Sequence, residues 1–210
     1  MAIIAGASGA NIKPIETGVY IARCFSMIHI GTIPGEYQGV PNESDKVQIT
    51  FELPLELEVF NQEKGPQPRV ISREFTLSLG TKANLRTFLK NWRGKDFTDE
   101  EAAAFDISKL LGVPCQLNIT HRPPAKNGRV YAEISGITPL MRGVDCPSQV
   151  NPSFEFSVNN FDQDKFNTLP KFIQEKIQSS KEYKELKGID VHQEDTHEQT
   201  QAEEDLGLPF

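Results

Sequence analysis

Residues 69–79 read RVISREFTLSL and residues 81–92 read TKANLRTFLKNW, and the spacing of the apolar side chains changes between them. In the first stretch polar and apolar residues alternate, which is the two-residue period of a β-strand. In the second stretch the apolar residues recur at the spacing of one helix face: Leu85, Phe88, Leu89 and Trp92. The sequence therefore predicts a strand followed directly by a helix, with Trp92 in the core.

Four further strands are predicted around this junction, over residues 17–30, 47–60, 114–121 and 129–137. Residues 31–46 hold three glycines and two prolines, so we expect a long loop there. Thr98 and Glu101 form a capping box that begins a short second helix, and residues 107–112 close the helical segment. One more helix is expected within residues 161–177.

The resulting order is β-β-β-α-β-β, in a mainly β protein. This is the connectivity of the OB-fold, a five-stranded Greek-key barrel, here with a helical insert. An SH3-like barrel lacks the intervening helix, and an RRM requires the order β-α-β-β-α-β. We expect a leader over residues 1–16, an OB-fold body over 17–142, a helical extension over 143–187 and a disordered acidic tail over 188–210.

The charges are distributed unevenly along the chain. The 210 residues carry 22 basic and 29 acidic side chains, for a net charge of −7. Seven acids and no base lie in residues 188–210, so the preceding part of the chain is neutral. Residues 69–142 hold twelve bases and seven acids, which makes the second half of the predicted body basic.

Several protein classes are disfavoured by the composition. No apolar run approaches the ~20 residues that span a bilayer, and the first ten residues lack the basic start of a signal peptide. Three widely spaced cysteines argue against a disulfide framework and for a reducing compartment, so we expect a cytoplasmic protein. The sequence contains no common catalytic or zinc-binding motif, and we expect no enzyme, no cofactor and no metal.

The basic residues suggest a binding surface for single-stranded DNA. An OB-fold binds nucleic acid on its second and third strands and on the loops beside them. Lys and Arg side chains follow the phosphates, while aromatic rings stack on bases. The candidate residues are Arg23, Tyr37, Lys46, Arg69, Arg73, Arg122, Lys126, Arg129 and Tyr131. Phe51 and Phe75 also lie on strands, but their alternation with apolar neighbours favours the core.

The C-terminal tail carries a second candidate site. Its composition is too polar for a folded core. It nevertheless ends EEDLGLPF, where apolar residues follow an acidic run and stop at the terminal carboxylate. A disordered acidic tether with a hydrophobic tip is typical of a short recognition element. The candidate partner-binding residues are Glu203, Glu204, Asp205, Leu206, Leu208, Pro209 and Phe210.

A body of this type with an acidic tail ending in Pro-Phe resembles the single-stranded DNA-binding proteins of bacteria and their phages. The segment from SREFTLSL to CQLNITH (residues 72–121) is also similar to tailed-phage DNA-replication proteins. The resemblance implies a protein of the bacterial host cytoplasm that protects single strands during replication and recombination. Its tail would recruit a polymerase, helicase or nuclease and would compete with DNA for the basic groove.

The tip departs from the bacterial pattern, in which a run of Asp precedes Ile-Pro-Phe directly. Here Leu206 and Gly207 separate the acids from Leu208-Pro209-Phe210, so host and phage partners both stay open. The alternative function is a protein-interaction adaptor whose barrel binds protein rather than DNA. The sequence also leaves open whether the chain forms a homo-oligomer.

Overall fold

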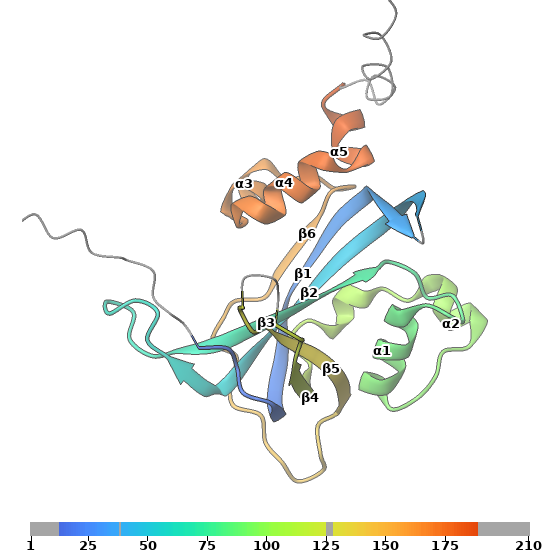
Figure 1. The fold of residues 1–210 in the computed structure, drawn as a ribbon. Coiled ribbons are helices and arrows are strands. Elements are labelled where there is room, and N and C mark those ends of the chain that lie inside the picture. Colours follow the sequence, from blue (N-terminus) through green and yellow to red (C-terminus); the bar gives the residue numbers. More distant parts are fainter. Residues whose placement is uncertain (1–12, 38, 125–127, 189–210) are drawn as a thin grey trace, which may run out of the picture. The chain divides into compact units, whose positions relative to one another are not determined.

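The computed structural model describes residues 13–37, 39–124 and 128–188 (Figure 1). In this part of the chain six strands form one mainly antiparallel sheet with the neighbour order β3-β2-β1-β4-β5, and β6 also pairs with β1. The strands are β1 (Gly18–Tyr37), β2 (Val40–Glu58), β3 (Gln67–Thr76), β4 (Pro114–His121), β5 (Ala132–Pro139) and β6 (Phe154–Ser157). The predicted mainly β class is therefore confirmed.

The chain divides into two compact units. The first contains the described residues up to Met27 together with Gln48–Glu155, and the second contains Ile28–Val47 together with the described residues from Phe156 on. The boundary passes through the middle of β1 and of β2, so both strands contribute to both units.

The prediction of a long loop over residues 31–46 was wrong. β1 continues to Tyr37 and β2 begins at Val40, with Gly39 at φ +78° in the turn between them. The prolines of this segment, Pro34 and Pro41, are exposed. Proline is tolerated in a strand where its missing N–H faces away from the ladder, so Gly and Pro here do not end the strands.

β4 connects the two halves of the sheet in the first unit. It pairs with β1 from Gly18↔Ile119 to Arg23↔Pro114. It also pairs with β5, with a register shift between Asn118 and Ile119. β4 has the predicted bounds, whereas β5 begins three residues later than expected. Among the described residues the hydrogen-bonded path ends at β3 and β5, so the sheet is not closed.

Helix α1 (Asn84–Arg93) covers the core of the first unit. Its four apolar residues are the predicted ones, and all are buried: Leu85, Phe88, Leu89 and Trp92. The ring of Phe51 on β2 lies 5.3 Å from that of Trp92, and the ring of Phe75 on β3 lies 4.7 Å from that of Phe88. The predictions that Phe51, Phe75 and Trp92 belong to the core are confirmed.

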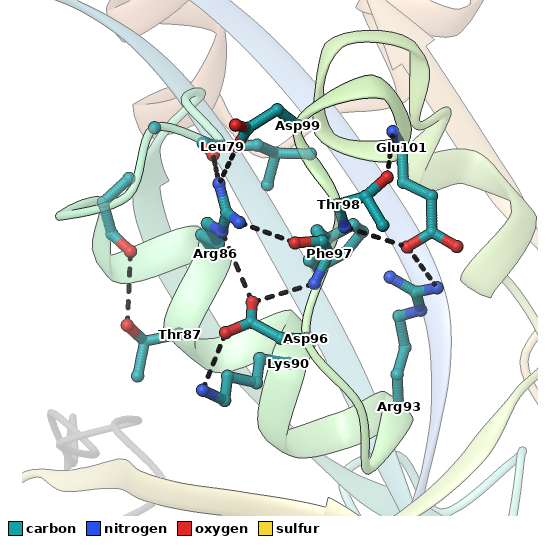
Figure 2. A network of polar contacts seen from close by, with 12 residues as sticks. Leu79, Arg86, Thr87, Lys90, Arg93, Asp96, Phe97, Thr98, Asp99 and Glu101 are labelled. Atoms are coloured by element: carbon teal, nitrogen blue, oxygen red, sulfur yellow. Dashed lines mark hydrogen bonds and ion pairs between the residues drawn. The ribbon is translucent and has the colours of Figure 1, made fainter.

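A polar network ties the segment after α1 back onto that helix (Figure 2). Asp96 accepts a hydrogen bond from Lys90 at 2.8 Å, and Arg86 donates to the carbonyl of Phe97 at 2.7 Å. Arg93 lies 3.5 Å from Glu101, which is part of the predicted and confirmed capping box at the start of α2 (Asp99–Ala104). Three bases of the basic half are therefore paired within this network. The short 3-10 helix η1 (Ile107–Leu110) then leads to β4.

The described residues of the second unit form three short helices where one was expected: α3 (Gln163–Thr168), α4 (Lys171–Ser179) and α5 (Lys181–Leu186). Asp162 and Ser180 cap α3 and α5 through their side chains. Aromatic rings form the centre of this unit. Phe161 lies 5.3 Å from Phe166, and Phe166 stacks on Tyr183 at 5.8 Å. Helices this short depend on such packing for their stability.

Candidate nucleic-acid interface

The hairpin between β4 and β5 gathers three of the predicted DNA-binding residues. The Arg122 amide donates to the Tyr131 carbonyl at 2.9 Å, which closes the base of the hairpin. The Arg122 guanidinium is 65% exposed and pairs with Glu133 at 2.6 Å. The Tyr131 side chain is 47% exposed, and Arg129 beside it is exposed as well. A hairpin with an accessible aromatic ring and two exposed arginines has the chemistry to stack on a base and contact phosphates.

The two arginines of β3 are occupied by the protein itself. Arg73 donates to the Ile134 carbonyl of β5 at 2.8 Å, and its guanidinium lies 5.0 Å from the centre of the Phe75 ring. Arg69 lies 3.5 Å from Glu58 and donates to the carbonyl of Lys13. Only 16% of the Arg69 side chain is exposed. Arg73 therefore ties β3 to β5, and Arg69 ties the start of the chain to the end of β2.

Arg23 on β1 also makes internal contacts. Its guanidinium donates to the carbonyls of Gly112 at 2.6 Å, Pro147 at 2.9 Å and Cys146 at 3.3 Å. The bonds to Cys146 and Pro147 attach the segment after β5 to the sheet. The sequence could not distinguish this from phosphate binding, because a partly buried arginine serves both purposes.

The remaining predicted residues lie in the second unit or outside the described part of the structure. Lys46 is partly buried on the portion of β2 that belongs to the second unit. Tyr37 ends β1, and its side chain lies outside the described part. Lys126 and the tail residues 203–210 also lie outside the described residues.

Glu52 is a buried carboxylate that the sequence analysis did not single out. It is 0% exposed and accepts hydrogen bonds from the amides of Val150 and Asn151 at 3.0 and 2.9 Å. The Asn151 side-chain amide donates a third bond at 2.8 Å. Together with Arg23, Glu52 holds residues 146–151 against the sheet. The sequence feature that could have identified Glu52 is its place as an acid between the apolar residues Phe51 and Leu53.

A polar cluster in the second unit was also missed. The two ring nitrogens of His29 lie 2.7 Å from a carboxylate oxygen of Asp45 and 2.9 Å from the Ser157 hydroxyl. Glu182 on α5 accepts bonds from the Thr32 amide and hydroxyl, both at 2.7 Å. Burial alone would raise the pKa of Glu182, but these hydrogen bonds outweigh it and lower that pKa. The cluster joins β1, β2, β6 and α5.

The three cysteines are free thiols, and Cys24 and Cys115 are fully buried. Burial raises the pKa of Cys24 to about 12. Across the described ranges no group of three or more His, Cys, Asp or Glu residues could hold a metal ion. No helix in the same part of the chain is long and apolar enough to cross a membrane.

Comparison with known proteins gives no assignment. The chain matches no protein-family model, and no curated protein matches its sequence. Any function must therefore be argued from the residues and their geometry.

Proposed function

We propose that this protein binds and protects single-stranded DNA during phage DNA replication or recombination and recruits replication proteins through its C-terminal tip. The carrying observation is the β4–β5 hairpin, which holds a half-exposed Tyr131 together with the exposed Arg122 and Arg129. Base stacking on an aromatic side chain contributes roughly 1–3 kcal/mol and tolerates every base. Such a surface suits a strand of any sequence.

We further propose that the body is an OB-fold. The neighbour order β3-β2-β1-β4-β5 with helices between β3 and β4 supports this assignment. The bond from Arg73 to Ile134 brings β3 and β5 together, as closure of such a barrel requires. In an OB-fold the loop between the fourth and fifth strands borders the nucleic-acid site, and in this chain Arg122 and Tyr131 lie at the base of the β4–β5 hairpin.

The pairing of charges in the body sets the expected strength of the electrostatic contribution. Arg86, Lys90 and Arg93 are paired with acids near α1, so they add little to a phosphate-binding surface. The hairpin carries three bases, Arg122, Lys126 and Arg129, and Arg122 would exchange its ion pair with Glu133 for a phosphate contact. One to three phosphate contacts with a single strand correspond to a slope of log K against log salt of about −0.7 to −2. Binding should therefore depend on salt only moderately.

The tail supplies the proposed recruitment function. Its seven acids and the apolar residues Leu208-Pro209-Phe210 offer a negative charge and an apolar contact to a basic-rimmed pocket. The same negative charge would repel or displace DNA from the body. Removing residues 188–210 should tighten DNA binding and abolish capture of a polymerase, helicase or nuclease. If truncation leaves DNA affinity unchanged, the tail acts on partners alone.

The direct test is fluorescence anisotropy of labelled oligo(dT) with the full chain and with residues 1–187, between 50 and 300 mM salt. Tyr131→Ala should weaken binding about 5- to 150-fold, the range that corresponds to loss of one stacked base. Arg122→Ala with Arg129→Ala should weaken binding and flatten the salt slope. Lys64→Ala, an exposed lysine in the β2–β3 turn, is the control and should have no effect.

Absence of binding by residues 1–187 at low salt would exclude the DNA-binding proposal. Tail-dependent partner capture without DNA affinity would instead favour the adaptor function. Equal losses for Lys64→Ala and Tyr131→Ala would mean that the hairpin is not the binding surface.

A further inference from the structure

The sheet of the first unit has one face that packs on α1 and a second face that carries exposed apolar side chains. On the first face the rings of Phe51 and Phe75 contact the aromatic side chains of α1. On the second, five large side chains are exposed by 49–68%, and we call this surface the open face: Val19, Leu55, Leu57, Val70 and Val150. An apolar sheet face of this kind is normally buried against another layer.

The exposed side chains of β2 and β3 lie on the same side of the sheet. Exposed and partly buried residues alternate at the end of β2, so Leu55 and Leu57 point to one side and Glu58 to the other. On β3, the exposed Val70 likewise points away from the side of Arg69. Glu58 and Arg69 pair at 3.5 Å, so these two residues share one face. The two leucines and Val70 therefore lie together on the opposite face.

The open face continues toward the middle of β2. Ser72 follows Val70 by two residues on β3, and its hydroxyl lies 3.0 Å from that of Thr50 on β2. Thr50 in turn shares its side of β2 with Glu52. Glu52 and Leu55 are three residues apart, so the alternation of β2 shifts by one residue between them, where the strand holds a proline. Glu52 therefore belongs to the open face.

Val19 and Val150 belong to this face through contacts of Arg23 and Glu52. The register of β1 against β4 is regular up to Arg23, so Val19 and Arg23 point to one side. Arg23 and Glu52 both bond to residues 146–151, which places them on the same face. The Val150 amide itself donates to Glu52 at 3.0 Å. This segment covers one end of the open face, and the other end is exposed.

The size of the open face fits an interface between two copies of the chain. Val59 and Phe60, each exposed by 47%, follow β2 directly and adjoin the face at the turn. At roughly 80–90 Å² each, the seven side chains expose about 600 Å². Two copies in contact would remove about 1,200 Å² from solvent, which reaches the range of stable, specific interfaces.

We propose that the open face joins two copies of this chain in a dimer with twofold symmetry. The exposed side chains that form it are uncharged, so the same surface of a second copy meets it without like-charge repulsion. Two sheets packed in this way form a sandwich. Single-stranded DNA is a poor occupant, because an apolar face offers its phosphates no charge or hydrogen bond in exchange for water. The dimer does not depend on the β4–β5 hairpin or on DNA binding.

The test is sedimentation equilibrium of the full chain without DNA, from about 1 to 100 µM. The mass should approach twice the 23.5 kDa of one chain. Leu57→Asp should raise the dissociation constant of the dimer at least about 100-fold, because twofold symmetry buries the new carboxylate twice. Phe172→Asp, a change at an equally exposed residue of α4 in the second unit, should leave it unchanged. A mass of one chain at 100 µM, or equal constants for the two variants, would overturn the proposal.

Photo-crosslinking locates the interface without relying on the folding of Leu57→Asp. Leu55 is replaced by p-benzoylphenylalanine, and light and isotope-labelled chains are mixed before irradiation. The proposal expects crosslinks between light and labelled chains, located by mass spectrometry in the strands and segment of the open face. Crosslinks confined to one chain would show that the chain covers this face itself and would overturn the proposal. Crosslinks from one chain to the β4–β5 hairpin or α4 of another would contradict the twofold arrangement.

Discussion

Replacing Glu52 by alanine tests whether a buried carboxylate holds the segment after β5 against the sheet. The substitution removes the acceptor of three hydrogen bonds, from the amides of Val150 and Asn151 and from the Asn151 side chain. Each buried donor left without a partner costs about 1–3 kcal/mol. Removing the desolvated charge and letting water reach the site offset part of this cost. We therefore expect a net loss of about 3 kcal/mol in the free energy of unfolding.

Urea denaturation followed by tryptophan fluorescence measures this loss. Trp92 is the single tryptophan of the chain and lies buried in the same unit as Glu52, so its emission reports on the relevant core. With a urea m value of about 2–3 kcal/mol/M, the midpoint should fall by roughly 1–1.5 M. Glu52→Gln keeps the shape and one acceptor oxygen, and we expect a smaller loss.

The matched control is Glu43→Ala, which removes an exposed acid from the same strand. Surface substitutions of this kind change stability by no more than about 0.5 kcal/mol. A loss below about 1 kcal/mol for Glu52→Ala, or a loss equal to that of Glu43→Ala, would refute the role assigned to Glu52.

Three further predictions concern a close backbone approach, a charged network and the thiols. Gly31 has φ +97° and an added Cβ would lie 2.5 Å from a Glu182 oxygen, so Gly31→Ala should cost about 2–4 kcal/mol in thermal or chemical unfolding. Gly39→Ala, with φ +78° and open space, should cost only about 1 kcal/mol, and equal losses would contradict the reasoning. The Lys90 ammonium and the Phe97 amide lower the pKa of Asp96 to about 2. The stabilisation from this carboxylate is therefore complete above its ordinary pKa of 3.8 and is lost as the pH falls through about 2. Carboxyl NMR should find a titration midpoint of about 2 for Asp96, and a midpoint near 3.8 would contradict the prediction. Only the partly exposed Cys146 thiol should react readily with DTNB before unfolding, and rapid reaction of three thiols in the folded protein would be inconsistent with the burial of the other two.

Local periodicity was sufficient to predict the elements on which the sheet and its helix depend. β4 has the expected bounds because its apolar residues alternate without interruption between two clear turns. The face of α1 followed from four apolar residues at helical spacing. The prediction failed for residues 31–46 because their glycines and prolines are typical of a loop, whereas pairing between β1 and β2 keeps the segment extended. β6 was missed because four residues carry too little periodicity.

The candidate site was less predictable, because a charged residue does not reveal its own partner. Arg23, Arg69 and Arg73 were selected by type and strand position, and in the structure their guanidinium groups bond to main-chain carbonyls. The bonded carbonyl lies 61 residues away in sequence for Arg73 and 56 residues away for Arg69. For Arg23 the bonded carbonyls lie between 89 and 124 residues away. No local pattern encodes contacts over such separations. The exposure of Arg122 and Tyr131 follows from their place in a hairpin loop, because solvent reaches a turn between two strands.

The passage of β1 and β2 through both units has a consequence for any attempt to divide this protein. The second unit is built from two separate stretches of chain, Ile28–Val47 and the described residues from Phe156 on. No single cleavage releases it, since a cut before Phe156 leaves the ribbon of Ile28–Val47 attached to the first unit. That ribbon would then lack Ser157 and Glu182, the partners of His29 and Thr32. A shortened protein ending near residue 155 should consequently aggregate and be readily proteolysed in this ribbon. A protein ending at residue 187 keeps every described contact of the second unit except those of Gly188.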